Sequence, residues 1–255
     1  MTTLTRPLRQ RAFTEADIGT KLKGWRKEGL NGKDGNRIHG FVNPIGFGLV
    51  HVVNQKSADG KLADLYDQFV LIENPGAIVV CTDAAGRVGL VPNFRLVGDR
   101  PPEILERLKN PDSGKYDYAA YVRTLRDKRL VEDVLATLGE HVWELPRGLA
   151  PAGEAADLQA FVRKVAAIEA KEEAGFDVTD VRLRGKVNAN TTFFPHAQHV
   201  VSATIVGVGK SRPEALESIG KVNMFTTAQL RQMADDDQLF DGLTLACLAK
   251  VGYAF

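Results

Sequence analysis

The feature that most constrains this chain is a group of three glutamates at the end of a predicted helix. Glu169, Glu172 and Glu173 lie within about one turn of each other, because residues three and four apart share a helix face. Gly175 follows them and suits the left-handed conformation that ends many helices. Like charges at this spacing repel each other. The arrangement therefore favours a bound hard cation, which prefers a few carboxylates together with phosphate oxygens and water.

The alternative is a solvated acidic surface, and the apolar residues of the helix argue against it. At about 100° per residue, one side of the helix is apolar: Phe161, Val162, Val165 and Ile168. The glutamates continue that side, whereas the basic residues lie on the other: Arg163, Lys164 and Lys171. A solvated acidic face would lie opposite the apolar stripe. The pattern favours a metal site on a helix expected over residues 158–174.

Composition and charge exclude several classes of partner. With 44% hydrophobic and 25% charged residues among 255, the chain is typical of soluble globular proteins, and a cytoplasmic location is expected. Its formal net charge is only +1, so no general field attracts nucleic acid or an anionic membrane, and neither is expected as a partner. No apolar run is long enough to span a bilayer. Cys81 and Cys247 lie in apolar surroundings far apart, which favours buried thiols over a disulfide.

The chain is expected to form two parts. A β-rich lobe is predicted over residues 1–66, and a second domain over 67–255 carries a helical insertion at about 99–141. Patterns of apolar and turn-forming residues predict further elements. The expected strands are 49–53, 68–72, 77–81, 87–91, 142–145, 178–187 and 199–208. The expected helices outside the insertion are 14–25, 158–174, 228–233, with Thr227 as its cap, and 243–251.

Other kinds of site find little support. Glycine-rich phosphate loops are absent, and no Ser-His-Asp set is visible. His196 and His199 are three apart beside a strand, where alternation sends side chains to opposite faces, so they are a poor metal pair. Cys81 lies in the middle of a predicted strand without a basic neighbour, which argues against a nucleophile.

The residues around the glutamates resemble the Nudix box. That motif is Gly, five residues, Glu, seven residues, then Arg-Glu-aliphatic-any-Glu-Glu-any-Gly-aliphatic. The chain has Gly148, five residues and Glu154, and later the run Glu169-Ala-Lys-Glu-Glu-Ala-Gly-Phe176. Ile168 stands at the Arg position, and thirteen residues separate it from Glu154 where the motif has seven. The resemblance covers residues 67–255, including a hairpin at 76–95 and the approach at 144–148.

The resemblance implies a fold and an activity. The fold would be α/β (α+β), an α/β/α sandwich with a mixed sheet. The activity would be metal-dependent hydrolysis of a pyrophosphate bond in a small nucleoside diphosphate-linked compound such as ADP-ribose or a nucleotide sugar. The β-rich lobe followed by this domain is similar to the ADP-ribose and nucleotide-sugar branch, in which the lobe often helps to build a homodimer, so the resemblance implies a homodimer. Ile168 and the altered spacing leave an alternative, a catalytically weak or inactive Nudix-fold protein that binds nucleotides or regulates.

The resemblance also implies roles for particular residues. Mg²⁺ or Mn²⁺ would be held by Glu154, Glu169, Glu172 and Glu173, the last three being catalytic. A further glutamate on a late loop would assist the attacking water, with Glu217 preferred over Glu214. The candidates for substrate contacts are Arg95, Glu144 and Arg147. For Arg95 the alternative is an exposed arginine at a strand end. In the family the box arginine pairs with a box carboxylate, and Arg147 is the candidate to replace it.

Overall fold

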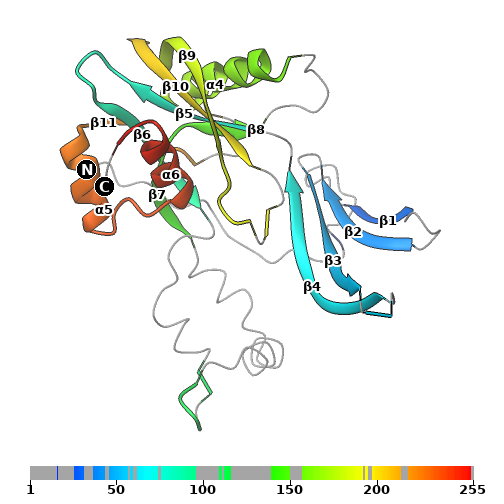
Figure 1. Ribbon diagram of the computed structural model, residues 1–255. Coiled ribbons are helices and arrows are strands. Elements are labelled where there is room, and N and C mark those ends of the chain that lie inside the picture. The colour runs from blue at the N-terminus through cyan, green and yellow to red at the C-terminus, as the bar shows by residue number, and fades with distance from the viewer. Residues whose placement is uncertain are drawn as a thin grey trace.

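Two β-sheets form the framework of the protein in the computed structural model (Figure 1). Of the chain, the structure describes residues 16, 26–31, 37–43, 46–56, 58–59, 62–73, 76–95, 109–110, 112–115, 139–149, 157–191, 193–194, 197–213 and 218–253. All of the helix predicted at 14–25 except residue 16, and most of the insertion at 99–141, lie outside the described residues.

The first sheet is antiparallel and has the order β1-β2-β3-β4. Its strands are β1 (Arg26–Asn31), β2 (Arg37–Asn43), β3 (Gly46–Lys56) and β4 (Leu62–Glu73). β3 and β4 form a long hairpin in which Gly46 pairs with Glu73. The first sheet thus continues to residue 73, beyond residue 66 where the sequence placed the end of the lobe. β1 and β2 were not predicted, because their residues show no clear apolar alternation.

The second sheet is mixed and seven-stranded, with the path β11-β6-β5-β10-β9 and with β7 on β6 and β8 on β5. β10 runs parallel to β5, and the other pairings are antiparallel. The strands are β5 (Gly76–Thr82), β6 (Val88–Arg95), β7 (Glu140–Glu144), β8 (Arg147–Leu149), β9 (Phe176–Val187), β10 (Gln198–Val208) and β11 (Asn223–Phe225). The mixed sheet expected from the sequence is therefore confirmed.

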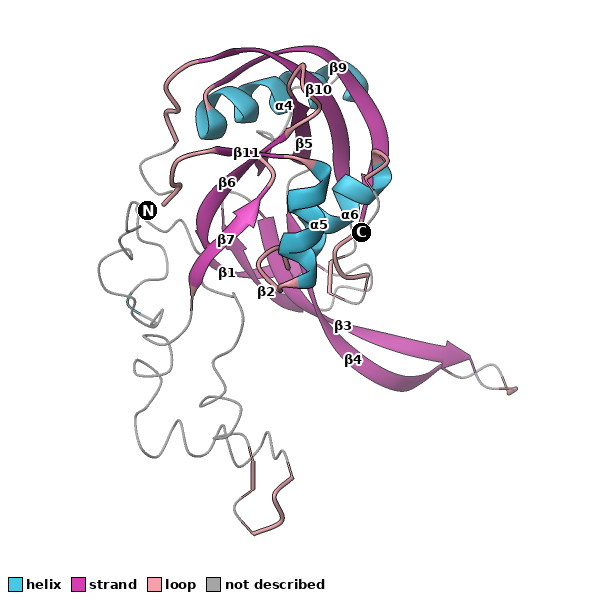
Figure 2. Cartoon of the chain, turned by 90° about the vertical axis from the view of Figure 1, so that its left-hand side faces the viewer, coloured by secondary structure: helices cyan, strands magenta, loops and turns pink. Residues whose placement is uncertain are grey.

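Helices cover both faces of the second sheet (Figure 2). They are α4 (Leu158–Ala174), α5 (Thr227–Asp235) and α6 (Gly242–Lys250). Successive side chains of β5 point to opposite faces of the sheet, so this strand contributes residues to two hydrophobic cores. Val79 packs in the core beneath α4, and Val80 packs in the core beneath α5 and α6. These layers are the α/β/α arrangement predicted for the second domain.

Helix α4 has the predicted bounds and both predicted ends. The Asp157 side chain accepts a hydrogen bond from the Gln159 amide at 2.9 Å, and Gly175 adopts the left-handed conformation with φ 73°. The predicted apolar side is buried at Val162 and Val165 but not at Ile168, which is 41% exposed. The buried side instead includes Ala166 and Ala170. Their small side chains let the helix approach the sheet, which turns Ile168 away from it.

The C-terminal helices have side-chain caps. The cap of α5 is Thr226, not the predicted Thr227, and it forms a reciprocal capping box with Gln229. Asp241 caps α6 by accepting a hydrogen bond from the Thr244 amide at 2.9 Å. No helix among the described residues is long and apolar enough to cross a membrane.

The two cysteines are free and buried, as the sequence predicted. Burial raises the pKa of Cys81 to about 12. Burial likewise raises the pKa of Cys247 to about 12. A thiol with so high a pKa stays protonated near neutral pH, and the thiolate is the reactive form. Burial therefore disfavours the reactive thiolate at both cysteines.

The end of α4 predicts a difference between two glycine substitutions. A Cβ atom at Gly175 would lie 2.5 Å from the Gly209 carbonyl oxygen, whereas one at Gly86, also left-handed with φ 75°, meets nothing within 4 Å. Gly86→Ala is expected to cost about 1 kcal/mol of unfolding free energy, from backbone strain alone. Gly175→Ala adds a steric clash and should cost about 3 kcal/mol or more. Urea denaturation followed by circular dichroism measures both, and equal losses would contradict the clash.

Candidate functional site

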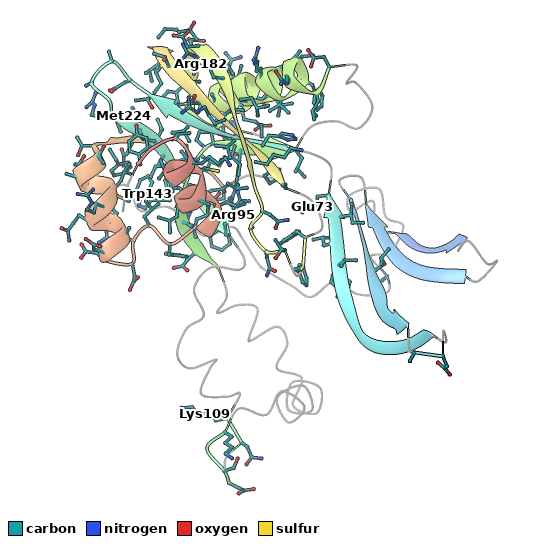
Figure 3. All side chains as sticks on the ribbon, in the orientation of Figure 1. Glu73, Arg95, Lys109, Trp143, Arg182 and Met224 are labelled. Atoms are coloured by element: carbon teal, nitrogen blue, oxygen red, sulfur yellow. The ribbon has the colours of Figure 1, made fainter. Side chains whose placement is uncertain are left out.

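A cavity of about 550 Å³ lies where the two sheets meet beside α4 and α6. Eleven residues line it: Glu73, Ala77, Ile78, Arg95, Arg147, Gly148, Leu149, Glu169, Glu172, Gln198 and Leu243. Glu73 ends β4 and Arg95 ends β6, so the two sheets bring charged side chains to one place (Figure 3). Most of the polar residues that the sequence singled out and the structure describes line this cavity.

Two of the three clustered glutamates, Glu169 and Glu172, line the cavity. Glu169 is half-buried and Glu172 is exposed. The Glu169 carboxylate lies directly against Gly148, so that a Cβ atom at position 148 would overlap it. Glycine at this position thus leaves the space that the carboxylate occupies. This contact explains in physical terms why glycine occupies position 148 in β8.

The third glutamate, Glu173, has a different environment. Its side chain is only 2% exposed, and its Oε2 accepts a hydrogen bond from the Arg147 main-chain amide at 2.9 Å. Within the described ranges, no three His, Cys, Asp or Glu side chains are arranged to hold a metal ion. Glu154, the fourth residue that the resemblance implies, lies outside those ranges, as do Glu214 and Glu217.

A buried ion pair joins β6 to β7 behind the cavity. Glu144 is 1% exposed, and Arg95 donates to it from Nε at 2.8 and 3.0 Å and from Nη2 at 2.6 Å. Burial by itself would lower the pKa of Arg95, but the hydrogen bonds and charge of Glu144 outweigh it and raise that pKa. The guanidinium therefore stays charged. Arg95 lines the cavity, so the alternative of a merely exposed arginine does not describe it.

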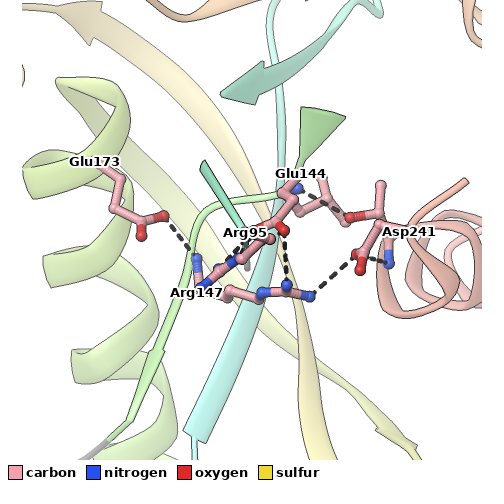
Figure 4. A network of polar contacts seen from close by, with 7 residues as sticks. Arg95, Glu144, Arg147, Glu173 and Asp241 are labelled. Atoms are coloured by element: carbon pink, nitrogen blue, oxygen red, sulfur yellow. Dashed lines mark hydrogen bonds and ion pairs between the residues drawn. The ribbon is translucent and has the colours of Figure 1, made fainter. Parts of the chain in front are cut away.

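Arg147 connects the loop to two acidic side chains (Figure 4). Its Nη2 lies 2.9 Å from Glu144 Oε1, and its Nη1 lies 3.1 Å from Asp241 Oδ2. Arg147 is the residue that the sequence analysis proposed in place of the arginine of the motif. Its main-chain amide, not its guanidinium, holds the box carboxylate Glu173. The main chain of Arg147 therefore contacts α4, and its side chain contacts Glu144 and Asp241.

Sequence reasoning missed Asp241, Glu73 and Gln198 as site residues. The run from Asp241 to Thr244 carries a recognisable helix cap, which predicts a local hydrogen bond but no contact with Arg147. No local pattern marks Glu73 or Gln198, because the cavity brings together the ends of strands that are far apart in sequence.

His199 is buried in β10 and does not form a metal site with the described residues. It is 4% exposed, and its Nδ1 lies 3.2 Å from the Gly76 carbonyl oxygen, which can only accept. Its Nε2 is buried with no hydrogen-bond partner in the described part of the chain. Burial lowers the pKa of His199, the Gly76 contact opposes this, and the charge of Lys186 adds to the lowering. His196 lies outside the described residues.

Comparisons with known proteins give limited similarity. The sequence matches no protein-family model, and no curated protein matches it. One similar solved structure is an ADP compounds hydrolase, 13% identical over 90% of this chain and 91% of that chain, with a TM-score of 0.46. Another is a NUDIX hydrolase from Nitrosomonas europaea, 13% identical over 71% of this chain and 91% of that chain, with a TM-score of 0.42. At this low sequence identity and TM-score, an argument about activity has to come from the residues that line the cavity.

The buried ion pair predicts a large effect of one substitution. Glu144→Gln would remove the counter-charge that Arg95 and Arg147 share, while Arg147 keeps its pair with Asp241, at an expected cost of about 1.5–3 kcal/mol in unfolding free energy. Arg87→Gln removes the exposed ion pair with Asp83, 2.8 Å long, and should cost less than about 1 kcal/mol. Chemical denaturation compares the two variants. Similar small losses in both would show that the buried pair does not stabilise the fold.

The lowered pKa of His199 predicts that the fold is less stable at acidic pH. Its pKa is lower in the folded chain than the ordinary value of about 6.5, so the unfolded chain takes up the proton first as the pH falls. The free energy of unfolding should therefore begin to drop as the pH falls through the ordinary histidine value of about 6.5. His199→Asn, whose amide can still donate to Gly76, should flatten that dependence. Burial also lowers the pKa of His141, so His141→Asn should remove part of the remainder. An unchanged slope in both variants would contradict this explanation.

Proposed function

We propose that this protein hydrolyses a pyrophosphate bond in a nucleoside diphosphate-linked compound such as ADP-ribose or a nucleotide sugar, using Mg²⁺ or Mn²⁺. One observation carries the proposal. Two carboxylates from α4, Glu169 and Glu172, and two guanidiniums, from Arg95 and Arg147, line the same cavity. Carboxylates suit a hard cation, and guanidiniums suit phosphate oxygens.

The charges of the cavity support the need for a cation. Of its charged lining residues, two are basic and three acidic, Glu73 being the third acid. The two guanidiniums also form ion pairs with Glu144 and Asp241 behind the lining. The site is therefore negative on balance, and a diphosphate entering alone would be repelled. Cations that enter with the diphosphate would remove that repulsion.

The available donors fit magnesium. This ion is usually held by one or two carboxylates, and substrate phosphates and water complete its coordination. Glu169 and Glu172 would provide the carboxylates, Gly148 leaves room for the first, and Glu154 is a further candidate. When bound, the metal would neutralise charge on the pyrophosphate and lower the pKa of an attacking water.

The chain's own groups would position the substrate. Arg95 and Arg147 are held by Glu144 in fixed geometry, so they would meet the phosphate oxygens without reorganising. Glu173 would keep the loop of Arg147 and Gly148 against α4. Glu217 remains the proposed residue that orients the water. A homodimer built with the lobe and a cytoplasmic location are further parts of the proposal.

A substrate panel tests the activity. With Mg²⁺ and nucleoside diphosphate compounds, including ADP-ribose and nucleotide sugars, the protein should release phosphate-containing products, and chelation should stop the release. Glu169→Gln and Glu172→Gln should each lower kcat/KM by at least about a hundredfold, since each removes a proposed metal ligand. Asp235→Asn, an exposed position at the end of α5, is the matched control and should leave kcat/KM unchanged.

The absence of product from every compound at high enzyme concentration would contradict the proposed hydrolysis. The second candidate, a nucleotide-binding protein without turnover, would then be favoured. The observation behind it is Ile168, which is exposed where the Nudix box has an arginine. This candidate predicts that a diphosphate compound raises the melting temperature without being cleaved.

A further inference from the structure

Residues 144–148 run from the end of β7 into the start of β8 and are called the loop at 144–148 below. The first turn of α6 contacts this loop at two points. The Thr244 hydroxyl oxygen accepts a hydrogen bond from the Leu145 main-chain amide at 3.1 Å, and Thr244 is fully buried. The Asp241 carboxylate caps α6 and also lies 3.1 Å from the Arg147 guanidinium. Figure 4 shows the loop between α4 and the start of α6. The N-terminus of α6 thus contacts the main chain of Leu145 and the side chain of Arg147.

The opposite side of the loop faces the carboxylates of α4. The Arg147 amide donates to Glu173, and Gly148 lies against the carboxylate of Glu169. The loop is also tied to the sheet, because the Val79 amide donates to the Pro146 carbonyl oxygen at 3.0 Å. A displacement of the loop on the α6 side would therefore change the positions available to both glutamates.

We infer that Asp241 and Thr244 are positioning residues that set the α4 carboxylates through the loop at 144–148. The inference rests on the proposed function for its catalytic consequence, but not for the structural link itself. The physical reason is the cost of an unpaired buried amide. If Thr244 no longer accepts from Leu145, the loop has to move until that amide finds another partner. Arg147 and Gly148 follow Leu145 as the start of β8, so a shift of Leu145 would reach them against the restraint of their pairing with β5.

The test uses substitutions that separate positioning from helix stability. Thr244→Val keeps the shape of the side chain and removes the acceptor, whereas Thr244→Ser keeps the hydroxyl. Asp241→Asn keeps a good cap for α6 and removes the charge that faces Arg147. The control is Thr226→Val, which removes the cap of α5; among the described residues the hydrogen bonds of the Thr226 side chain stay within the first turn of that helix. It reports what the loss of a cap does to stability alone.

Two measurements follow the variants without substrate. Amide hydrogen exchange at Arg147, observed by NMR, reports the hydrogen bond to Glu173. It should become about tenfold faster or more in Thr244→Val, less so in Asp241→Asn, and remain unchanged in Thr244→Ser and Thr226→Val. Binding of Mn²⁺, followed by electron paramagnetic resonance, should weaken about tenfold in Thr244→Val and less in Asp241→Asn. It should remain unchanged in Thr244→Ser and Thr226→Val. Loss of a residue that orients metal ligands typically weakens metal binding by such a factor.

Kinetics give the third measurement. Thr244→Val should lower kcat about tenfold or more with KM changed less than about twofold, because it would misplace reacting groups without touching the substrate. If Thr244→Val and Asp241→Asn only lower the melting temperature, as Thr226→Val does, and leave Arg147 exchange unchanged, the inference is wrong. If the wild type turns over nothing while the exchange result holds, the proposed function fails and the structural link stands.

Discussion

The buried carboxylate of Glu144 is the interaction on which the arrangement of the site depends. A charge that is 1% exposed is costly unless it is paired, and Glu144 is paired with both Arg95 and Arg147. These three residues come from β7, β6 and β8, and Arg147 extends the contact to the start of α6 through Asp241. Because Glu144 is buried and needs its two arginine partners, these ion pairs restrict the positions that residues 144–148 can take. Arg147 and Gly148 of this segment line the cavity, together with residues of the neighbouring strands β5 and β6.

This constraint changes how the clustered glutamates are understood. At the level of sequence they form one group on one helix face. In the structure they have three environments: Glu169 lies against Gly148, Glu172 is exposed at the cavity, and Glu173 is buried on a main-chain amide. The repulsion expected among them is relieved in part because Glu173 already has a donor. Glu169 and Glu172 line the cavity, and under the proposed function this pair of carboxylates would suit magnesium, which is seldom held by a closed protein cage.

Elements with strong local patterns could be predicted, and those that depend on distant partners could not. The apolar run of β5 and the turn at 83–86 define their hairpin locally, and α4 has both its bounds and its Gly175 end as expected. β8 is only three residues long and exists because it pairs with β5. The exposure of Ile168 also could not be read from periodicity, because alanines and aliphatic residues compete for the buried side and packing against the sheet decides between them.

The sequence by itself determined the ingredients of the site: glutamates three and four apart before a glycine, a glycine beside an arginine in the approach, and the strands that feed two cores. These follow from local geometry, since the spacing along a helix or strand decides which residues are neighbours. Only the tertiary structure decided which neighbours matter. It gave Glu73 and Gln198 to the cavity, Asp241 to Arg147, and the Arg147 main chain instead of its side chain to Glu173. The physical reason is that buried polar groups must find partners wherever the fold places them, and sequence spacing carries no record of contacts between distant segments.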